Sequence, residues 1–213
     1  METTRICLVR HGETAWNAER RLQGHLDVAL NDTGRRQAAA TAAALKTHTF
    51  DAVYCSDLSR ARMTAAVVAS SIDREAVPDP IWRERHYGAF QGLTYAEADA
   101  RFPHDYRRFV ERDTTFAFAQ GGESLLAFHA RVCDGLDKLV QRHSGCSVLL
   151  VTHGGVLDMV YRVATGKPLR AQRDFEIPNA AVNWVGFDDG RWHLIAWADR
   201  RHLDLSLDEL PNA

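Results

Sequence analysis

Three positions along the sequence place arginine, histidine or glycine where an apolar run ends. The segment RHG at 10–12 follows the apolar residues 6–9, and HGG at 153–155 follows the apolar run CSVLLVT at 146–152. Arg60 stands near the start of a helical pattern that follows another apolar run. Cationic side chains at the end of a core strand are costly to desolvate unless something there needs them. These residues are therefore candidates for a functional site.

A phosphoryl group is the ligand that this set of residues suits. The planar guanidinium of arginine holds two oxygen atoms at once, and the free N–H groups at the start of a helix attract anions. A glycine lets a ligand approach the backbone closely because it has no Cβ. Taken singly, His153 is equally consistent with a histidine that only packs in the core, and Arg60 is equally consistent with a solvated charge on a helix. Together with Arg10 and His11 they predict one site, because ligands of open α/β sheets bind beyond the carboxyl ends of the strands.

The patterning between these positions predicts alternating strands and helices. Cap-forming residues before an alanine-rich run indicate a helix at 31–47, and the turn signal DDG at 188–190 indicates a hairpin. The alternation predicts an α/β fold: a three-layer α/β/α sandwich whose central sheet is mostly parallel, with an antiparallel hairpin at one edge. The expected strands are 5–10, 51–56, 75–77 and 146–152, and the expected helices are 31–47, 58–72, 94–101, 105–112, 123–143 and 156–165.

Composition and charge exclude several classes of protein. Of the 213 residues, 46% are hydrophobic and 25% are charged, as in proteins with a packed core. The net charge of -2 lacks the basic footprint of a nucleic-acid-binding protein, and no apolar run reaches the roughly 20 residues of a membrane span. No signal peptide is visible and the four cysteines form no CxxC pair. We therefore expect a cytoplasmic protein with no nucleic-acid or membrane partner, built as one domain over 1–213 with 78–122 as an insertion over the active site.

Four motifs, in order from residue 6 to about residue 198, resemble those of the histidine phosphatase superfamily, the phosphoglycerate mutase-like family. They are LVRHGETAWN, CSDLSRARMTA, RERHYGAFQG and VTHGG. The resemblance implies that His11 is the nucleophile and forms a phosphohistidine, and that Glu84 is the general acid and base. It implies that Arg10, Arg60 and His153 bind the phosphoryl oxygens. The sequence has no HExxH motif and no aspartate cluster for a metal site, so we expect catalysis without a metal ion or cofactor. Further substrate-binding positions implied by the resemblance are Asn17, Gln23, Gly24, Tyr87 and Gly154.

The family contains phosphatases and mutases, and the sequence carries signals of both. The loop ERHYGAFQG resembles that of the mutases, and Arg107 and Arg108 match the arginine pair that mutases use for the substrate carboxylate. Tyr95 stands where mutases have a lysine, and the GGES motif at 121–124 resembles the phosphatase branch. We therefore expect a metal-independent phosphatase of small phosphate monoesters. The alternative is a phosphoglycerate mutase that is primed by 2,3-bisphosphoglycerate.

The sequence predicts the kind of partner but leaves the oligomeric state and the packing of two groups of residues open. The expected partner is a small phosphorylated metabolite, and a homodimer and a monomer are both open. A non-catalytic binding module is disfavoured, because the nucleophile, the acid and the phosphate-binding residues are all present. Three aromatic residues of the insertion form either its core or a wall of the site: Phe90, Phe116 and Phe118. Three alternating leucines of the tail either pair as a strand or fray: Leu203, Leu205 and Leu207.

Overall fold

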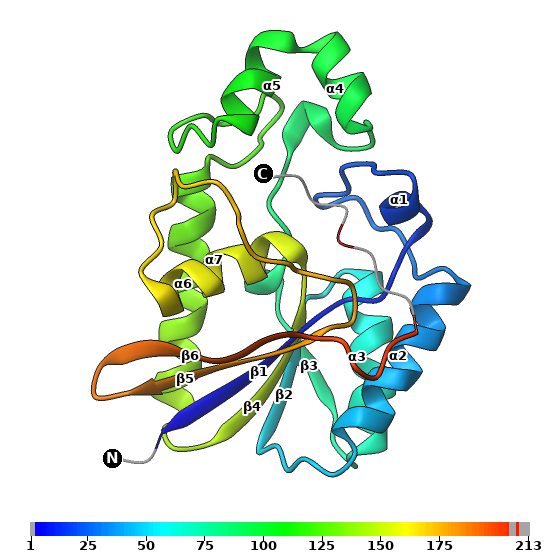
Figure 1. The fold of residues 1–213 in the computed structure, drawn as a ribbon, viewed down its shortest axis with the longest axis vertical. Helices are drawn as coiled ribbons and strands as arrows, with labels where there is room; N and C mark the ends of the chain where they lie inside the picture. The colour runs from blue at the N-terminus through cyan, green and yellow to red at the C-terminus, as the bar shows by residue number, and fades with distance from the viewer. Residues whose placement is uncertain (1–2, 205–207, 209–213) are drawn as a thin grey trace.

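The computed structural model describes residues 3–204 and residue 208. Its strands are β1 (Thr4–Arg10), β2 (Ala52–Cys55), β3 (Ala76–Pro78), β4 (Ser147–Thr152), β5 (Val182–Asp188) and β6 (Arg191–Asp199). They form one six-stranded sheet in the order β3-β2-β4-β1-β5-β6 (Figure 1). The first four strands of this order pair in parallel, whereas β5 pairs antiparallel with β1 and with β6. The predicted parallel sheet with an antiparallel edge hairpin is confirmed.

Helices cover both faces of the sheet, which gives the predicted three layers. Helices α2 (Asp32–Leu45) and α3 (Ser59–Ser71) pack against one face, and α6 (Leu125–Arg142) and α7 (Gly154–Thr165) pack against the other (Figure 1). Successive side chains of a strand point to opposite faces, so Ile6 and Leu8 of β1 join the α6–α7 side while Cys7 and Val9 join the α2–α3 side. The other α-helices are α1 (Ala15–Ala18), α4 (Tyr95–Arg101) and α5 (Pro103–Val110), and two short 3-10 helices are η1 (Pro80–Trp82) and η2 (Gly88–Phe90).

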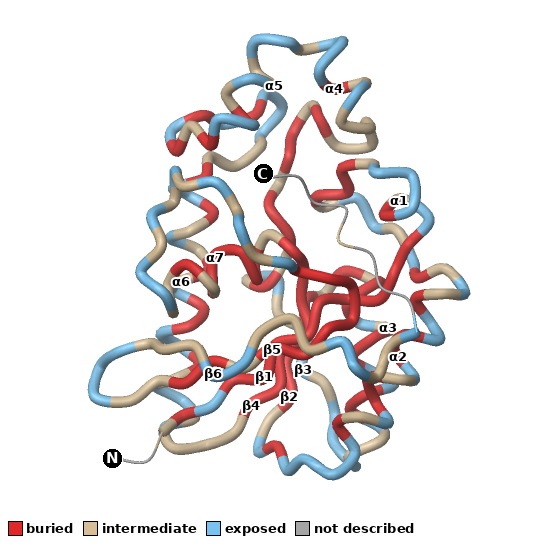
Figure 2. The backbone as a smooth tube through the Cα atoms, viewed as in Figure 1, coloured by how far each residue is buried: buried red, intermediate tan, exposed pale blue. Residues whose placement is uncertain are grey.

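The buried residues concentrate where the strands lie, as the red tube in Figure 2 shows. Several element boundaries differ from expectation by one or two residues. The predicted helix at 105–112 begins earlier, because Pro103 is pre-set for the first turn of α5. The predicted helix at 156–165 begins at Gly154, directly after His153. Strand β3 includes Pro78 because it is an edge strand, where a missing N–H is tolerated.

Residues 78–122 carry α4 and α5, which lie beyond the end of the sheet (Figure 1). Phe90, Phe116 and Phe118 are buried in an aromatic cluster of this segment, so the first of the two alternatives for them, a core of the insertion, is confirmed. The organisation of 1–213 as one domain stays a prediction. Leu205 and Leu207 of the tail lie outside the described residues. Among the described helices, none is long and apolar enough to cross a membrane.

Candidate active site

The register of β1 against β4 places the two histidines side by side. Arg10 pairs with Thr152 at the ends of these parallel strands, and the backbone N–H of His11 donates to the carbonyl oxygen of Thr152 at 2.8 Å. The next residue of each strand is a histidine, and the ring centroids of His11 and His153 are 5.1 Å apart. Both rings are buried, at 3% and 0% exposure. Two histidines that are 142 positions apart in sequence therefore share one site.

Arg60 reaches the same site from the first turn of α3, which follows β2. Its Nε donates to Nδ1 of His153 at 3.2 Å, and its two terminal nitrogens donate to the carbonyl oxygens of Leu26 at 2.9 Å and Gly24 at 2.8 Å. Burial lowers the pKa of the guanidinium to about 10. Arg60 is therefore still cationic near neutral pH, and two separate parts of the chain, the loop at 24–26 and His153, fix its orientation.

Arg10 and the backbone of His11 are held by the segment that precedes β5. Nη1 of Arg10 donates to the carbonyl oxygen of Ile177 at 2.8 Å, and the amide of Asn179 donates to the carbonyl oxygen of His11 at 3.0 Å. The backbone N–H of Ala180 donates to the carbonyl oxygen of Arg10 at 3.0 Å. Sequence reasoning missed this segment, because an isolated Pro-Asn-Ala stretch carries no catalytic signal.

The protonation of the two imidazoles follows from their partners. Nδ1 of His11 lies 2.7 Å from the carbonyl oxygen of Gly12. A carbonyl oxygen only accepts, so Nδ1 carries the proton and Nε2 carries a lone pair. Burial, followed by the charges of Arg60 and Arg10, lowers the pKa of His11 well below 6.5 and keeps the ring neutral. His11 is therefore suited to act as a nucleophile at Nε2.

His153 has the opposite tautomer. Its Nδ1 accepts from Arg60, so the proton of the neutral ring sits on Nε2. That Nε2 atom is buried and has no hydrogen-bond partner among the described residues. A buried donor without a partner is costly, and an oxygen atom of a bound anion would satisfy it. Burial, followed by the charge of Arg60 and of a protonated His11, lowers the pKa of His153 well below 6.5.

Glu84 brings a carboxyl group to the cavity from the loop before Tyr87. Its Oε2 accepts the backbone N–H of Gly155 at the start of α7 at 2.9 Å, and its Oε1 accepts its neighbour's N–H, from Arg85, at 2.7 Å. Burial raises the pKa of Glu84, although these hydrogen bonds and the nearby arginines oppose the shift. A Cβ at Gly155 would collide with the Glu84 carboxylate, so any larger residue at this position would displace that carboxylate.

Most of the predicted site residues line one small polar cavity. Asn17 is positioned by a capping box, in which its Oδ1 accepts the backbone N–H of Thr14 at 2.9 Å. Three lining residues were not predicted as site residues: Arg21, Leu22 and Tyr95. Arg21 and Leu22 carry no local signal, and Tyr95 was noted only as the residue at the place of the mutase lysine. The predicted residues that line the cavity are Arg10, His11, Asn17, Gln23, Gly24, Arg60, Glu84 and Tyr87.

The structure does not bring every predicted residue to this cavity. His153 is not among the residues that line it but packs against two that do, His11 and Arg60. Gly154 begins α7 without lining the cavity. Arg107 and Arg108 are absent from the lining. Arg108 pairs instead with Asp113 at 2.8 Å, and Arg107 faces a separate surface hollow on α5. The expected arginine pair for a substrate carboxylate is therefore not part of the cavity.

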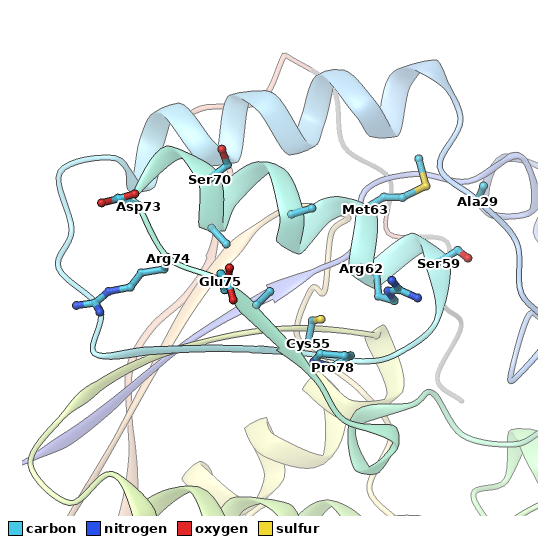
Figure 3. Close-up of a pocket in the computed structure, with 13 residues that line it drawn as sticks. Ala29, Cys55, Ser59, Arg62, Met63, Ser70, Asp73, Arg74, Glu75 and Pro78 are labelled. Atoms are coloured by element: carbon cyan, nitrogen blue, oxygen red, sulfur yellow. The ribbon is translucent and has the colours of Figure 1, made fainter.

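A larger hollow of about 1050 Å³ lies elsewhere, along α3 and the edge strand β3 (Figure 3). Its lining includes Arg62, Met63 and Glu75 but none of the predicted site residues. Size therefore does not identify the site here; the titratable groups with shifted pKa values do. Within the described part of the chain, no three His, Cys, Asp or Glu side chains gather as they would around a metal ion.

Comparison with known proteins agrees with this geometry. The family model of the histidine phosphatase superfamily (branch 1) matches residues 6–200. The chain is 41% identical to the phosphoglycerate mutase-like protein 4 of Arabidopsis thaliana, over 93% of this chain and 86% of that protein. It is 39% identical to the metal-independent phosphoserine phosphatase of Arabidopsis thaliana, over 95% and 84%. Among solved structures, Bacillus stearothermophilus YhfR superimposes with a TM-score of 0.86 at 31% identity and covers 93% of this chain and 98% of its own.

Proposed function

Because the chain belongs to the histidine phosphatase superfamily, we propose that it hydrolyses small phosphate monoesters through a phosphohistidine on His11, without a metal ion. One observation carries the proposal. The carbonyl oxygen of Gly12 holds the proton of His11 on Nδ1, which leaves the Nε2 lone pair in a cavity that also contains Arg60 and the buried carboxyl group of Glu84.

In the first step, Nε2 of His11 attacks the phosphorus atom. A P–N bond forms, the P–O bond to the ester oxygen breaks, and the leaving alkoxide takes the proton of Glu84. Negative charge on the three remaining phosphoryl oxygens is stabilised by Arg10, Arg60 and the Nε2–H of His153. The raised pKa of Glu84 supports its role, because the group must hold a proton until the leaving oxygen needs one.

In the second step, a water molecule replaces the product alcohol. The Glu84 carboxylate takes a proton from this water while its oxygen attacks the phosphorus atom of the phosphohistidine. The P–N bond breaks, inorganic phosphate leaves, and the Nε2 lone pair of His11 is restored. Glu84 is protonated again, so the enzyme returns to its starting state with one water consumed.

L-phosphoserine is the first substrate to test, because the metal-independent phosphoserine phosphatase is among the similar proteins. A phosphoglycerate mutase primed by 2,3-bisphosphoglycerate is the alternative, supported by the name of the other plant relative. The positions of Arg107 and Arg108 disfavour this alternative, because a mutase would need them at the cavity. A cytoplasmic location stays a prediction from the sequence, and a homodimer and a monomer are both still open.

The test uses chelator-treated protein with L-phosphoserine and with 3-phosphoglycerate, the latter with and without 2,3-bisphosphoglycerate. Free phosphate and 2-phosphoglycerate are both measured, and His11→Ala is the blank. We expect phosphate release that needs no divalent ion and an acid-labile phosphate label on His11. Formation of 2-phosphoglycerate that needs the bisphosphate would establish the mutase instead. Activity that disappears on chelation and returns with a divalent ion would refute the metal-independent mechanism.

A further inference from the structure

The GGES motif at 121–124 has no part in the steps above, yet its glutamate makes a specific ion pair. The two carboxylate oxygens of Glu123 accept hydrogen bonds from Nε and Nη2 of Arg131, each at 2.8 Å. Oε2 also accepts the backbone N–H of His86 at 2.9 Å. Burial raises the pKa of Glu123, but the hydrogen bonds and charge of Arg131 outweigh burial and the pKa is lowered. Glu123 is therefore ionised and binds the guanidinium of Arg131 through both of its carboxylate oxygens.

The remaining N–H groups of Arg131 all donate to backbone carbonyl oxygens of the segment that carries Glu84. Nη1 donates to the carbonyl oxygens of Ile81 at 2.7 Å and Arg83 at 2.9 Å, and Nη2 donates to the carbonyl oxygen of Glu84 at 3.1 Å. With the two bonds to Glu123, the five N–H groups of the guanidinium are all used. Lysine has one nitrogen and three donors, so it cannot reproduce this arrangement.

Glu84 is consequently held at both of its ends. Its backbone carbonyl oxygen accepts from Arg131 and lies 2.8 Å from Nε2 of His25, while its carboxylate accepts the N–H of Gly155. Arg131 belongs to α6 and Gly155 to α7, two helices that pack against each other on one face of the sheet. Fixing the backbone from one helix and the carboxylate from the other sets the direction of the side chain between them.

We propose that the Glu123–Arg131 ion pair is a positioning device for the acid–base group of the reaction, and that Arg131 and Glu123 are positioning residues that act through Glu84. The inference rests on the proposed function, because it assumes the role of Glu84. The reason is geometric: proton transfer requires the donor within hydrogen-bond reach of the leaving oxygen, and a displacement of about 1 Å costs about 10²-fold in rate. Through this ion pair, the glutamate of the GGES motif affects the rate of the reaction.

A positioning role can be separated from a purely structural one by the leaving group. Phenyl phosphate and p-nitrophenyl phosphate present the same ring, but phenolate needs a proton as it leaves and nitrophenolate scarcely does. The ratio kcat/KM reports steps up to formation of the phosphohistidine, so it isolates the acid role of Glu84 from its later role as a base. Loss of acid catalysis therefore lowers kcat/KM for phenyl phosphate far more than for p-nitrophenyl phosphate.

The experiment measures kcat/KM of Arg131→Lys and Glu123→Gln on both esters, with thermal unfolding measured alongside. We expect a loss of about 10- to 100-fold on phenyl phosphate and a much smaller loss on p-nitrophenyl phosphate for both variants. Arg142→Lys is the matched control, because it is the same change at the end of α6, where Nη1 bonds the Tyr54 hydroxyl away from the cavity. It is expected to retain wild-type values on both esters.

Equal losses on the two esters in both folded variants would overturn the positioning role, as would wild-type values. Glu84→Gln distinguishes this result from a failure of the proposed function. If Glu84→Gln is selective for phenyl phosphate and the two positioning variants are not, only the present inference is wrong. If Glu84→Gln is not selective either, Glu84 is not the general acid, and the acid–base step of the proposed function is wrong as well.

Discussion

Nε of Arg60 lies 3.2 Å from Nδ1 of His153, and this one hydrogen bond couples a residue in the first turn of α3 with the residue that follows β4. It fixes the tautomer of His153 and directs the remaining proton to Nε2, a buried atom without a hydrogen-bond partner among the described residues. The same guanidinium holds the loop around Gly24. A change at Arg60 is therefore expected to disturb charge, tautomer and loop position together.

Arg60→Lys tests that coupling. Lysine keeps the charge but has no planar fork, so the bonds to His153, Gly24 and Leu26 cannot all form. We expect kcat/KM on an alkyl phosphate to fall by about 10²- to 10³-fold, measured with circular dichroism as a check on folding. Arg62→Lys, an exposed position on the same helix, is the control and should retain activity. Wild-type kinetics in Arg60→Lys would contradict the assigned role.

The pH dependence should reflect the neutral state of His11. Burial and the charges of Arg60 and Arg10 lower its pKa below 6.5. The neutral ring is the attacking form, so protonation of His11 removes activity on the acid side, as pH falls through this lowered pKa. We expect the acid limb of kcat/KM, corrected for titration of the substrate, to lie below pH 6.5 in a profile over about pH 4 to 8.

The direction of the pKa shift of His11 can be tested with Arg60→Gln. Removing the positive charge makes protonation of His11 less unfavourable, so the pKa rises and the acid limb should move to higher pH. The measurement is the same pH profile on the variant, at whatever reduced rate it retains. An acid limb that moves to lower pH, or does not move, would show that another group controls it.

Gly155→Ala is expected to separate activity from stability. Alanine is favoured over glycine inside a helix by about 1 kcal/mol, but its Cβ would occupy the place of the Glu84 carboxylate. We expect kcat to fall by about 10²-fold on an alkyl phosphate while the protein stays folded. Thermal unfolding and kcat measured on one preparation check this, and a variant that is both folded and fully active would refute the position of Glu84.

Arg107→Gln addresses the mutase alternative. Arg107 is exposed on α5 and faces a hollow other than the catalytic cavity, so we expect kcat/KM for L-phosphoserine to change by less than about twofold, as for most surface positions. The same variant is assayed with 3-phosphoglycerate. A selective rise in KM for 3-phosphoglycerate would instead return Arg107 to carboxylate binding and favour the mutase.

Local sequence was sufficient to place most of the fold and the first residues of the site. Apolar runs, cap residues and turn signals identified each long element to within a few residues, because these depend on neighbours in the chain. The positions of Arg10, His11 and His153 followed from one rule, that parallel strands end at the same edge of a sheet. The roles of Glu84 and Tyr87 came from the family resemblance, because a charged loop has no signal of its own.

The tertiary structure decided what depends on contacts between distant segments. It placed Arg107 and Arg108 away from the cavity and brought Arg21 and Tyr95 into it. No spacing in the chain predicts which carbonyl oxygens Arg131 will reach, since its partners lie 47 to 50 positions away. Hydrogen-bond partners are chosen by packing, and packing is settled only when the helices dock on the sheet. Local motifs therefore determine which residues carry the chemistry of the site, while packing of the folded chain determines how those residues are aligned.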